Sequence, residues 1–156
     1  MILLVVKTVH VLSAMLFLGA GLMTAYYKVR ADRSGELRVL VWYQREIVLA
    51  DWLFTLPSGI ALPATGIWLA TSYGIPLTSS YVAAGIVGYA IAGALWLPAA
   101  WLQIRMRALA AAALRDGTDL PPQFHKANRA WLALGVPAFL VAAFTVWVMV
   151  AKTTPW

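Results

Sequence analysis

The chain has 156 residues, of which 62% are hydrophobic and 12% are charged. Soluble domains average about 45–50% apolar and about 25% charged residues, and a small domain lacks the interior to bury such a surplus. The composition therefore excludes a secreted globule, a cytosolic enzyme and a disordered protein. It predicts a protein that uses lipid as part of its solvent.

The formal net charge is +6, from twelve Lys and Arg residues against six Asp and Glu. The basic residues fall beside the apolar runs, a pattern typical of membrane topology and not of a surface that binds nucleic acid. The absence of cysteine excludes disulfides, iron–sulfur clusters, thiolate metal sites and thiol nucleophiles. No basic region precedes the first apolar run, which is also long, so we expect no cleaved signal peptide.

Four apolar stretches are long enough to cross a bilayer, which takes about 20 helical residues. In chain order they are Ile2–Tyr26, Ile47–Ala70, Tyr81–Leu102 and Trp131–Val150. Because backbone groups in lipid must bond within their own segment, we expect these spans to be helices. The sequence predicts an all-α fold: an up-down-up-down bundle of four transmembrane helices in one transmembrane domain, residues 1–156.

Three segments connect the spans: a charged loop over Tyr27–Glu46, a short polar turn over Thr71–Ser80 and a second charged loop over Gln103–Ala130. The two charged loops carry ten of the twelve basic residues, and only Lys7 and Lys152 fall on the other side. By the positive-inside rule, we expect both large loops to face the cytoplasm and both termini to face out.

The tryptophans agree with this placement, since amphipathic rings gather at the headgroup level. Trp42, Trp52, Trp101 and Trp131 fall near the expected inner boundary, and Trp68, Trp147 and Trp156 near the outer one. Trp96 alone falls well inside a span.

Three ionisable side chains fall inside the spans: Lys7, His10 and Asp51. Such groups are costly in hydrocarbon, so each is a candidate functional residue. His10 lies about 12 Å below the outer end, and Lys7 shares its helix face because the two are three residues apart. At that depth the other spans place Gly59, Leu62, Pro63, Gly66, Gly85, Gly88, Tyr89, Ala142, Ala143 and Thr145.

His10 has two interpretations. Small residues let transmembrane helices approach closely, so the imidazole can simply form hydrogen bonds between helices. Alternatively, the small residues leave a slot for a flat macrocycle such as haem, with His10 as the iron ligand. Lys7 then either meets a carboxylate of the ligand or extends to the headgroups. The candidate cofactor site comprises His10 as metal ligand with Lys7, Gly59, Pro63, Gly85, Gly88 and Tyr89.

Asp51 lies about 6 Å inside the expected cytoplasmic boundary, where an unpaired carboxylate is costly. Several polar residues end near the same level: Gln103, Arg105, His125 and Arg129. We expect Asp51 to form either a structural pair between helices or a proton-uptake pair with His125. His10 and His125 fall near opposite faces, about 27 Å apart along the helix rise. This excludes a haem held by both histidines, and leaves Met, Tyr, Lys, water or another copy as the second ligand.

Several motifs span nearly the whole chain. They are Lys7-x-x-His10, Asp51-Trp52-x-Phe54-Thr55-x-Pro57, Thr65-Gly66, Trp96-Leu97-Pro98, Trp101-Leu102-Gln103-Ile104-Arg105, Leu134-Gly135-x-Pro137-Ala138-Phe139 and Met149-Val150-x-Lys152. With these motifs the sequence resembles an uncharacterised bacterial family of four-helix membrane proteins, the domain of unknown function 2269. The resemblance implies a multi-pass protein of the bacterial cytoplasmic (inner) membrane.

More distantly, the layout is similar to HemJ-type protoporphyrinogen oxidases and copper-resistance-D-like membrane proteins. In the HemJ type, the first helix begins with Lys-x-x-His and that histidine is implicated in haem b binding, a position that His10 matches. The HemJ type also uses a lysine in its third helix, whereas Tyr81–Leu102 contains none. The resemblance therefore implies a haem b or porphyrin site at His10 and does not extend to protoporphyrinogen oxidation.

The sequence thus favours a haem-b-binding protein of the lipid bilayer, as a single copy or a homo-oligomer. Its expected role is redox chemistry or electron transfer with a quinone or a respiratory-complex partner. One alternative is a non-catalytic accessory or scaffold subunit whose small-residue faces bind other helices. Another alternative is a permease for a small solute or metal. A single intramembrane histidine provides few ligands along a path that a metal would follow.

Overall fold

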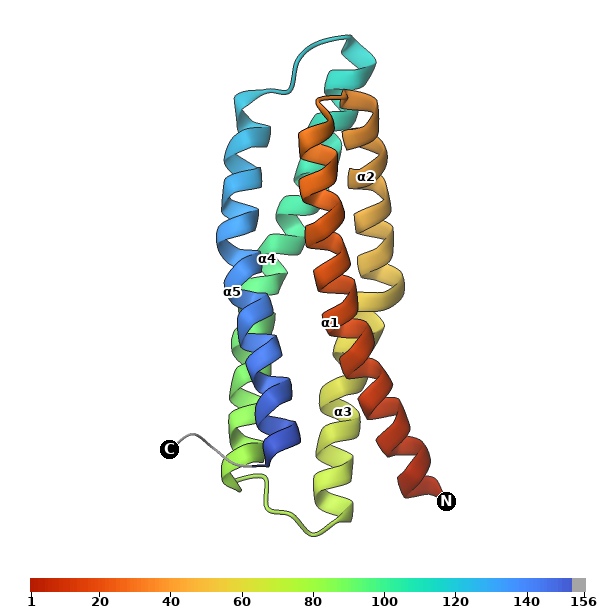
Figure 1. Cartoon of the computed structure of the whole chain (residues 1–156), viewed down its shortest axis with the longest axis vertical. Helices are drawn as coiled ribbons and strands as arrows, with labels where there is room; N and C mark the ends of the chain where they lie inside the picture. Colours follow the sequence, from red (N-terminus) through yellow and green to blue (C-terminus); the bar gives the residue numbers. More distant parts are fainter. Residues whose placement is uncertain (153–156) are drawn as a thin grey trace.

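The computed structural model describes residues 1–152, and every regular element in that range is helical. The elements are α1 (Ile2–Ser34), α2 (Leu37–Ala50), the π-helical turn η1 (Asp51–Thr55), α3 (Leu56–Ser72), α4 (Ser80–Asp116) and α5 (Pro122–Ala151). Since α2, η1 and α3 are continuous, the described residues form four long helical segments, each long and apolar enough to cross a membrane. Figure 1 shows them side by side, with the start of α1 and the end of α5 at the same end of the bundle. The predicted all-α class is confirmed.

The helices are longer than the sequence predicts. The loops expected over Tyr27–Glu46 and Gln103–Ala130 are wrong: both segments are helical apart from short turns at residues 35–36 and 117–121. Apart from Lys28, which is buried, the charges that indicate loops lie mostly on exposed helix faces. The opposite faces stay apolar at helical spacing, as at Leu40, Tyr43 and Ile47. These charged segments are therefore amphipathic extensions of the four helices.

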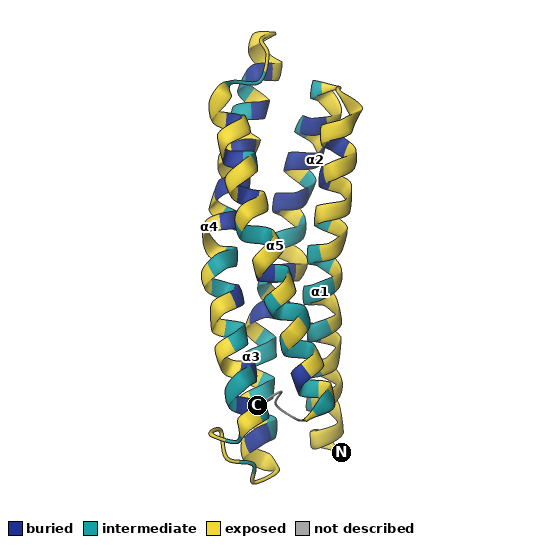
Figure 2. Ribbon diagram, turned by 60° about the vertical axis from the view of Figure 1, so that its left-hand side comes forward, coloured by how far each residue is buried: buried dark blue, intermediate teal, exposed yellow. Residues whose placement is uncertain are grey.

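The two ends of the bundle differ in how closely they are packed. We call the end with the turns at residues 35–36 and 117–121 the basic end. The end with residues 73–79, the start of α1 and the end of α5 is the terminal end. A continuous buried core lies towards the basic end, and Figure 2 shows the buried residues concentrated there. Its members are Ala31, Leu40, Tyr43, Ile47, Val48, Ala99, Leu102, Met106, Ala110, Phe124, Ala127 and Trp131.

Trp131 is the exception among the tryptophans expected in the boundary belts. It is only 7% exposed and belongs to the buried core, because the apolar face of α5 turns it inwards. Trp42, Trp52 and Trp101 are exposed, as a headgroup belt requires. Trp156 lies outside the described residues.

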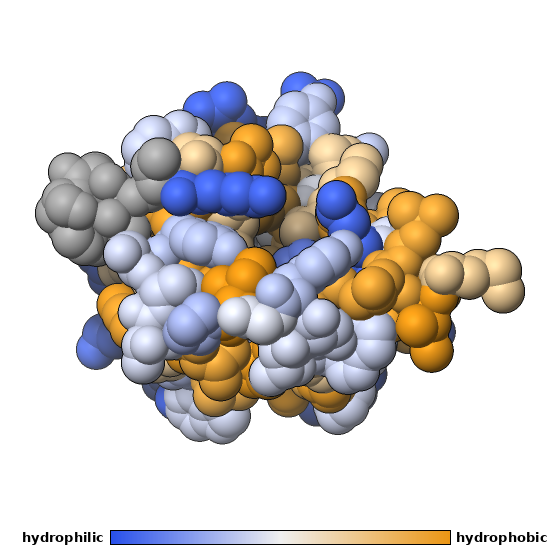
Figure 3. Space-filling model, turned by 90° about the horizontal axis from the view of Figure 1, so that it is seen from below, coloured by the Kyte–Doolittle hydropathy of each residue, from blue (hydrophilic) through white to orange (hydrophobic). Residues whose placement is uncertain are grey.

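Towards the terminal end, the bundle separates into two helix pairs. α1 packs against α3 and α4 packs along α5, whereas contacts between α3 and α4 are sparse. Large apolar side chains such as Ile60, Val87 and Leu140 point outwards and are exposed. Figure 3, seen from this end, shows polar and weakly polar residues over much of the end face, with apolar residues between them and along the rim. Apolar flanks of this kind are what a bilayer covers.

The π-helical turn η1 immediately precedes Pro57. Proline has no N–H group, so the carbonyl of Leu53 loses its helical donor. The helix accommodates the missing hydrogen bond with one wide π turn, in which the Leu56 N–H donates to the Asp51 carbonyl. Beyond it, α3 continues unbroken through Pro63. The irregular turn therefore centres on Asp51, and π turns of this kind are frequent at functional sites.

Candidate intramembrane sites

His10 lies on α1 against α3 and is half-buried. Its Nδ1 atom lies 3.1 Å from the carbonyl oxygen of Leu62 and 2.9 Å from Oγ1 of Thr65. The Thr65 hydroxyl in turn donates to the carbonyl of Ala61 over 2.6 Å. Because a carbonyl only accepts and the Thr65 proton is already used, the Nδ1 atom carries the imidazole proton.

This assignment leaves Nε2 of His10 as the nitrogen with a free lone pair. Among residues 1–152, no hydrogen bond reaches Nε2. An imidazole that ligates a metal usually donates its other N–H to a carbonyl, which fixes the tautomer and the ring orientation. The ring packs closely on α3, since a Cβ added at Gly66 would lie 3.0 Å from Cε1 of His10. The site thus presents one oriented, ligand-competent nitrogen.

Two of the glycines expected beside His10 belong to a different interface. A Cβ added at Gly85 would lie 1.7 Å from the terminal methyl carbon of Met149, and one at Gly88 would lie 2.1 Å from Oγ1 of Thr145. The side chains of α5 therefore fill the space that these glycines leave. Gly85 and Gly88 allow close packing of α4 on α5 and do not form a slot beside His10.

The remaining residues of the expected site are spread over three environments. The Tyr89 hydroxyl donates to the carbonyl of Gly59 over 2.6 Å, which joins α4 to α3. A Cβ added at Gly59 would face the ring of Phe17, not His10. Pro63 is half-buried inside α3, and Lys7 is exposed on α1. Of these residues, Lys7 alone shares a helix face with His10, three residues away on α1.

Asp51 begins the π-helical turn and has two polar neighbours. Oγ1 of Thr55 donates to its Oδ1 over 2.8 Å. Of the residues expected at this level, Gln103 of α4 lies next to Asp51 and is only 3% exposed. Thr55 is a partner that sequence reasoning missed, although its spacing of four residues from Asp51 places both on one helix face.

Asp51, Thr55 and Gln103 line a cavity of about 190 Å³, which we call the central cavity. Its other walls come from α1, α4 and α5, and include Phe17, Trp96, Trp131, Gly135 and Phe139. His10 is not part of its lining. The membrane-spanning region therefore contains two distinct candidate sites, the His10 nitrogen and the central cavity.

His125 lies away from both sites. It is exposed at the basic end, where it lines a separate hollow together with Asp32, Glu36 and Asp119. Asp51 and His125 therefore line different cavities. Over residues 1–152, no group of three or more His, Cys, Asp or Glu side chains is arranged to hold a metal ion.

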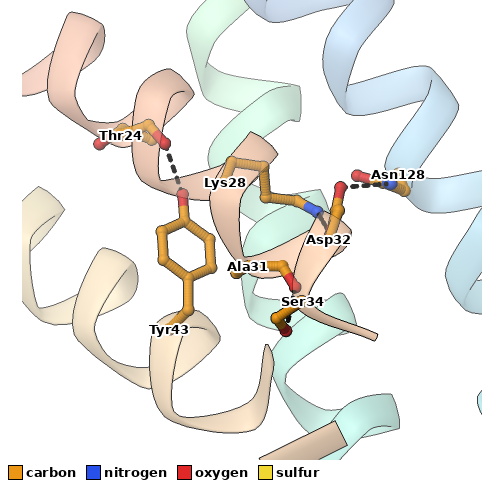
Figure 4. Close-up of polar contacts among 7 residues, drawn as sticks. All are labelled: Thr24, Lys28, Ala31, Asp32, Ser34, Tyr43 and Asn128. Carbon is orange, nitrogen blue, oxygen red and sulfur yellow. Dashed lines mark hydrogen bonds and ion pairs between the residues drawn. The ribbon is translucent and has the colours of Figure 1, made fainter. Parts of the chain in front are cut away.

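A buried polar cluster at the basic end was not anticipated from the sequence. Lys28 is 1% exposed and forms an ion pair with Asp32, one turn further along α1. Nδ2 of Asn128 on α5 donates to Oδ2 of Asp32 over 3.2 Å, and the Lys28 ammonium lies 5.8 Å from the centre of the Phe124 ring. Figure 4 shows this cluster beside the Tyr43 hydroxyl. The spacing of four residues between Lys28 and Asp32 is the one signal in the sequence for the pair.

Comparison with known proteins gives one match. The family model described as "Predicted integral membrane protein (DUF2269)" matches residues 4–153. No curated protein and no solved structure matches the chain. The match covers all four helical segments and both candidate sites, so each site lies within the part of the chain that defines the family.

Proposed function

The chain belongs to the family of predicted integral membrane proteins described as DUF2269, and we propose that it binds haem b within the membrane. In this proposal, Nε2 of His10 would hold the haem iron. The role of the bound haem is redox chemistry or electron transfer with a membrane partner.

The observation that carries the proposal is the hydrogen bonding of the His10 ring. Leu62 and Thr65 accept the Nδ1 proton, so in the neutral ring, which is the form that hydrocarbon favours, Nε2 keeps its lone pair. Neutral imidazole is a standard axial ligand of haem iron. An imidazole within a membrane span is costly unless its nitrogens are hydrogen-bonded or bind a ligand. The described residues bond only Nδ1 of His10, which leaves Nε2 for a ligand.

One further residue supports a haem at Nε2 of His10. Lys7 lies on the same face of α1 and is exposed, so its ammonium suits a propionate carboxylate. Gly85 and Gly88 take no part, because Met149 and Thr145 fill the space beside them. When bound, haem b supplies one-electron chemistry, and the chain's own contribution is to orient the imidazole through Leu62 and Thr65.

The test is the visible absorption spectrum of protein purified from cells supplied with haem. We expect a Soret band in the wild type that is lost in His10→Ala. The matched control is His125→Ala, which removes the chain's other histidine at the exposed basic end and should keep the full haem content. Circular dichroism should show the same helix content in all three proteins. A colourless wild type, or equal haem content in His10→Ala, contradicts the proposal.

A second candidate function is a non-catalytic accessory subunit, in which His10 only joins α1 to α3. The observation that favours it is the sparse contact between α3 and α4, which leaves helix faces free for another membrane helix. This function predicts a colourless wild type that copurifies with a stoichiometric partner. It also predicts that His10→Ala loses stability but no absorption band.

A further inference from the structure

We propose that the central cavity binds the ring of a lipid-soluble quinone-type molecule, that is, one oxygen-bearing ring with an apolar tail. The proposal rests on the cavity's size, walls, polar groups and opening. It does not depend on haem binding at His10, which lies outside the cavity lining.

The size of the cavity suits a single ring. Its volume is about 190 Å³, and a dry apolar protein cavity of about 150 Å³ accommodates benzene. One ring with small substituents therefore fits, whereas a macrocycle does not.

The walls are apolar, and several are aromatic. Ala92 and Ala99 of α4 and Ala138 of α5 leave the space open because they are small. Phe17 and Trp96 add flat apolar surfaces from two different helices. Aromatic side chains favour offset or edge contacts with another ring, so these walls suit a flat ring more than a bulky saturated group.

The polar groups of the cavity have unused hydrogen-bonding capacity. A carboxamide offers two N–H donors and an acceptor oxygen, and the contact with Asp51 leaves most of the Gln103 capacity unused. On Asp51, the hydrogen bond from Thr55 takes only Oδ1. Gln103 is 97% buried, so water does not readily satisfy it. A ring carbonyl accepts a hydrogen bond from this amide, whereas a plain hydrocarbon leaves the amide unsatisfied.

The cavity opens towards the lipid between α1 and α5. Leu22 of α1 and Val136 of α5 line it and are at the same time 56% and 55% exposed at the outer surface. Contacts between α1 and α5 are few compared with those between α4 and α5. A ring in the cavity therefore has an apolar route for its tail into the bilayer.

Two glycines provide a matched pair of variants. Gly135 lines the cavity, and a Cβ added there meets no atom within 4 Å, so a larger side chain at this position enters the cavity. A Cβ added at Gly19 also meets no atom within 4 Å, but Gly19 is exposed on α1 and does not line the cavity. Gly135→Leu and Gly19→Leu therefore make the same chemical change inside and outside the cavity.

The experiment uses wild-type and variant protein in nanodiscs, labelled with a photoreactive azido-quinone and competed with decylubiquinone. We expect labelled peptides from α1, α4 and α5 in the wild type and in Gly19→Leu. Gly135→Leu should lower labelling about tenfold, because its side chain would take up space that the ring needs. Gln103→Leu, which keeps the volume and removes the amide, should also weaken competition by decylubiquinone.

Three results would overturn the proposal: equal labelling of Gly135→Leu and Gly19→Leu, no effect of Gln103→Leu, or competition by decane as strong as by decylubiquinone. The last result would show a cavity that accepts any hydrocarbon chain. His10→Ala should label like the wild type, so failure of the haem proposal and failure of this one are separate outcomes.

Discussion

Lys28 shows how a single charge is tolerated in the core of this protein. Its side chain is 1% exposed, and a buried ammonium is costly unless it is paired and hydrogen-bonded. Asp32 supplies the opposite charge, and Asn128 and the Phe124 ring complete the surroundings. Both charges lie on α1, and the hydrogen bond from Asn128 joins Asp32 to α5, so loss of Asp32 should affect the packing of the two helices.

We predict that Asp32→Asn lowers the free energy of unfolding by about 3 kcal/mol, because it leaves the Lys28 charge buried without a counter-ion. Thermal unfolding in detergent, followed by circular dichroism, measures the change. The matched control is Arg115→Ala, which breaks the exposed pair with Asp116 and should cost no more than about 1 kcal/mol. Adding Lys28→Met to Asp32→Asn should restore most of the loss. An Asp32→Asn protein as stable as Arg115→Ala contradicts the role given to the pair.

Sequence reasoning identified His10 and Asp51 because ionisable residues stand out in an apolar span. It placed Gln103 at the level of Asp51 by counting residues along straight helices. It also placed Leu62 and Gly66 at the level of His10, and both contact the ring, but it missed Thr65, whose hydroxyl is unremarkable in sequence. Residue counting gives depth in the membrane, but the direction of a side chain depends on how the helices are rotated about their axes.

The helical elements were predictable in the spans and not beyond them. Hydropathy identifies the apolar residues that a helix needs inside lipid, so each predicted span ends where charged residues begin. α1 and α4 continue past that point because water solvates one face while the other packs on neighbouring helices. The π-helical turn was also missed, since Pro57 indicates a broken hydrogen bond but not which residues absorb the change.

The interface between α4 and α5 leads to a prediction about glycine. We predict that Gly88→Ala lowers the free energy of unfolding by about 1–3 kcal/mol, because its Cβ would meet Oγ1 of Thr145, which is held by a hydrogen bond to Val141. Gly85→Ala should cost less, since the obstacle is the flexible end of Met149. Unfolding titrations of the purified variants provide the measurement.

Gly93→Ala on α4 is the control for these two variants, because its Cβ meets no atom within 4 Å. It should be neutral or stabilise the helix by about 0.5–1 kcal/mol, as expected when alanine replaces glycine within a helix. An equal loss of stability in all three variants would contradict the role given to the fit between α4 and α5.

Across the whole molecule, the basic residues and the buried core share one end. The sequence-based orientation places this end in the cytoplasm, following the excess of Lys and Arg. The all-helical fold is compatible with either orientation, so the direction of insertion has to be measured. The absence of cysteine makes single-cysteine variants easy to interpret.

We predict that a membrane-impermeant maleimide labels Thr78→Cys in intact cells or spheroplasts, and labels Arg115→Cys only after the membrane is opened. Both residues are exposed, and they lie at opposite ends of the bundle. The positive-inside rule gives the expected direction. Labelling of Arg115→Cys alone in intact cells would reverse the orientation.

The unequal packing of the two ends has a mechanical consequence. The α1–α3 and α4–α5 pairs are joined firmly at the basic end and loosely at the terminal end. Each pair can therefore change its tilt at the terminal end to match a thicker or thinner bilayer while the core towards the basic end keeps its contacts. Hydrophobic mismatch would then be absorbed between the pairs and not within the helices themselves.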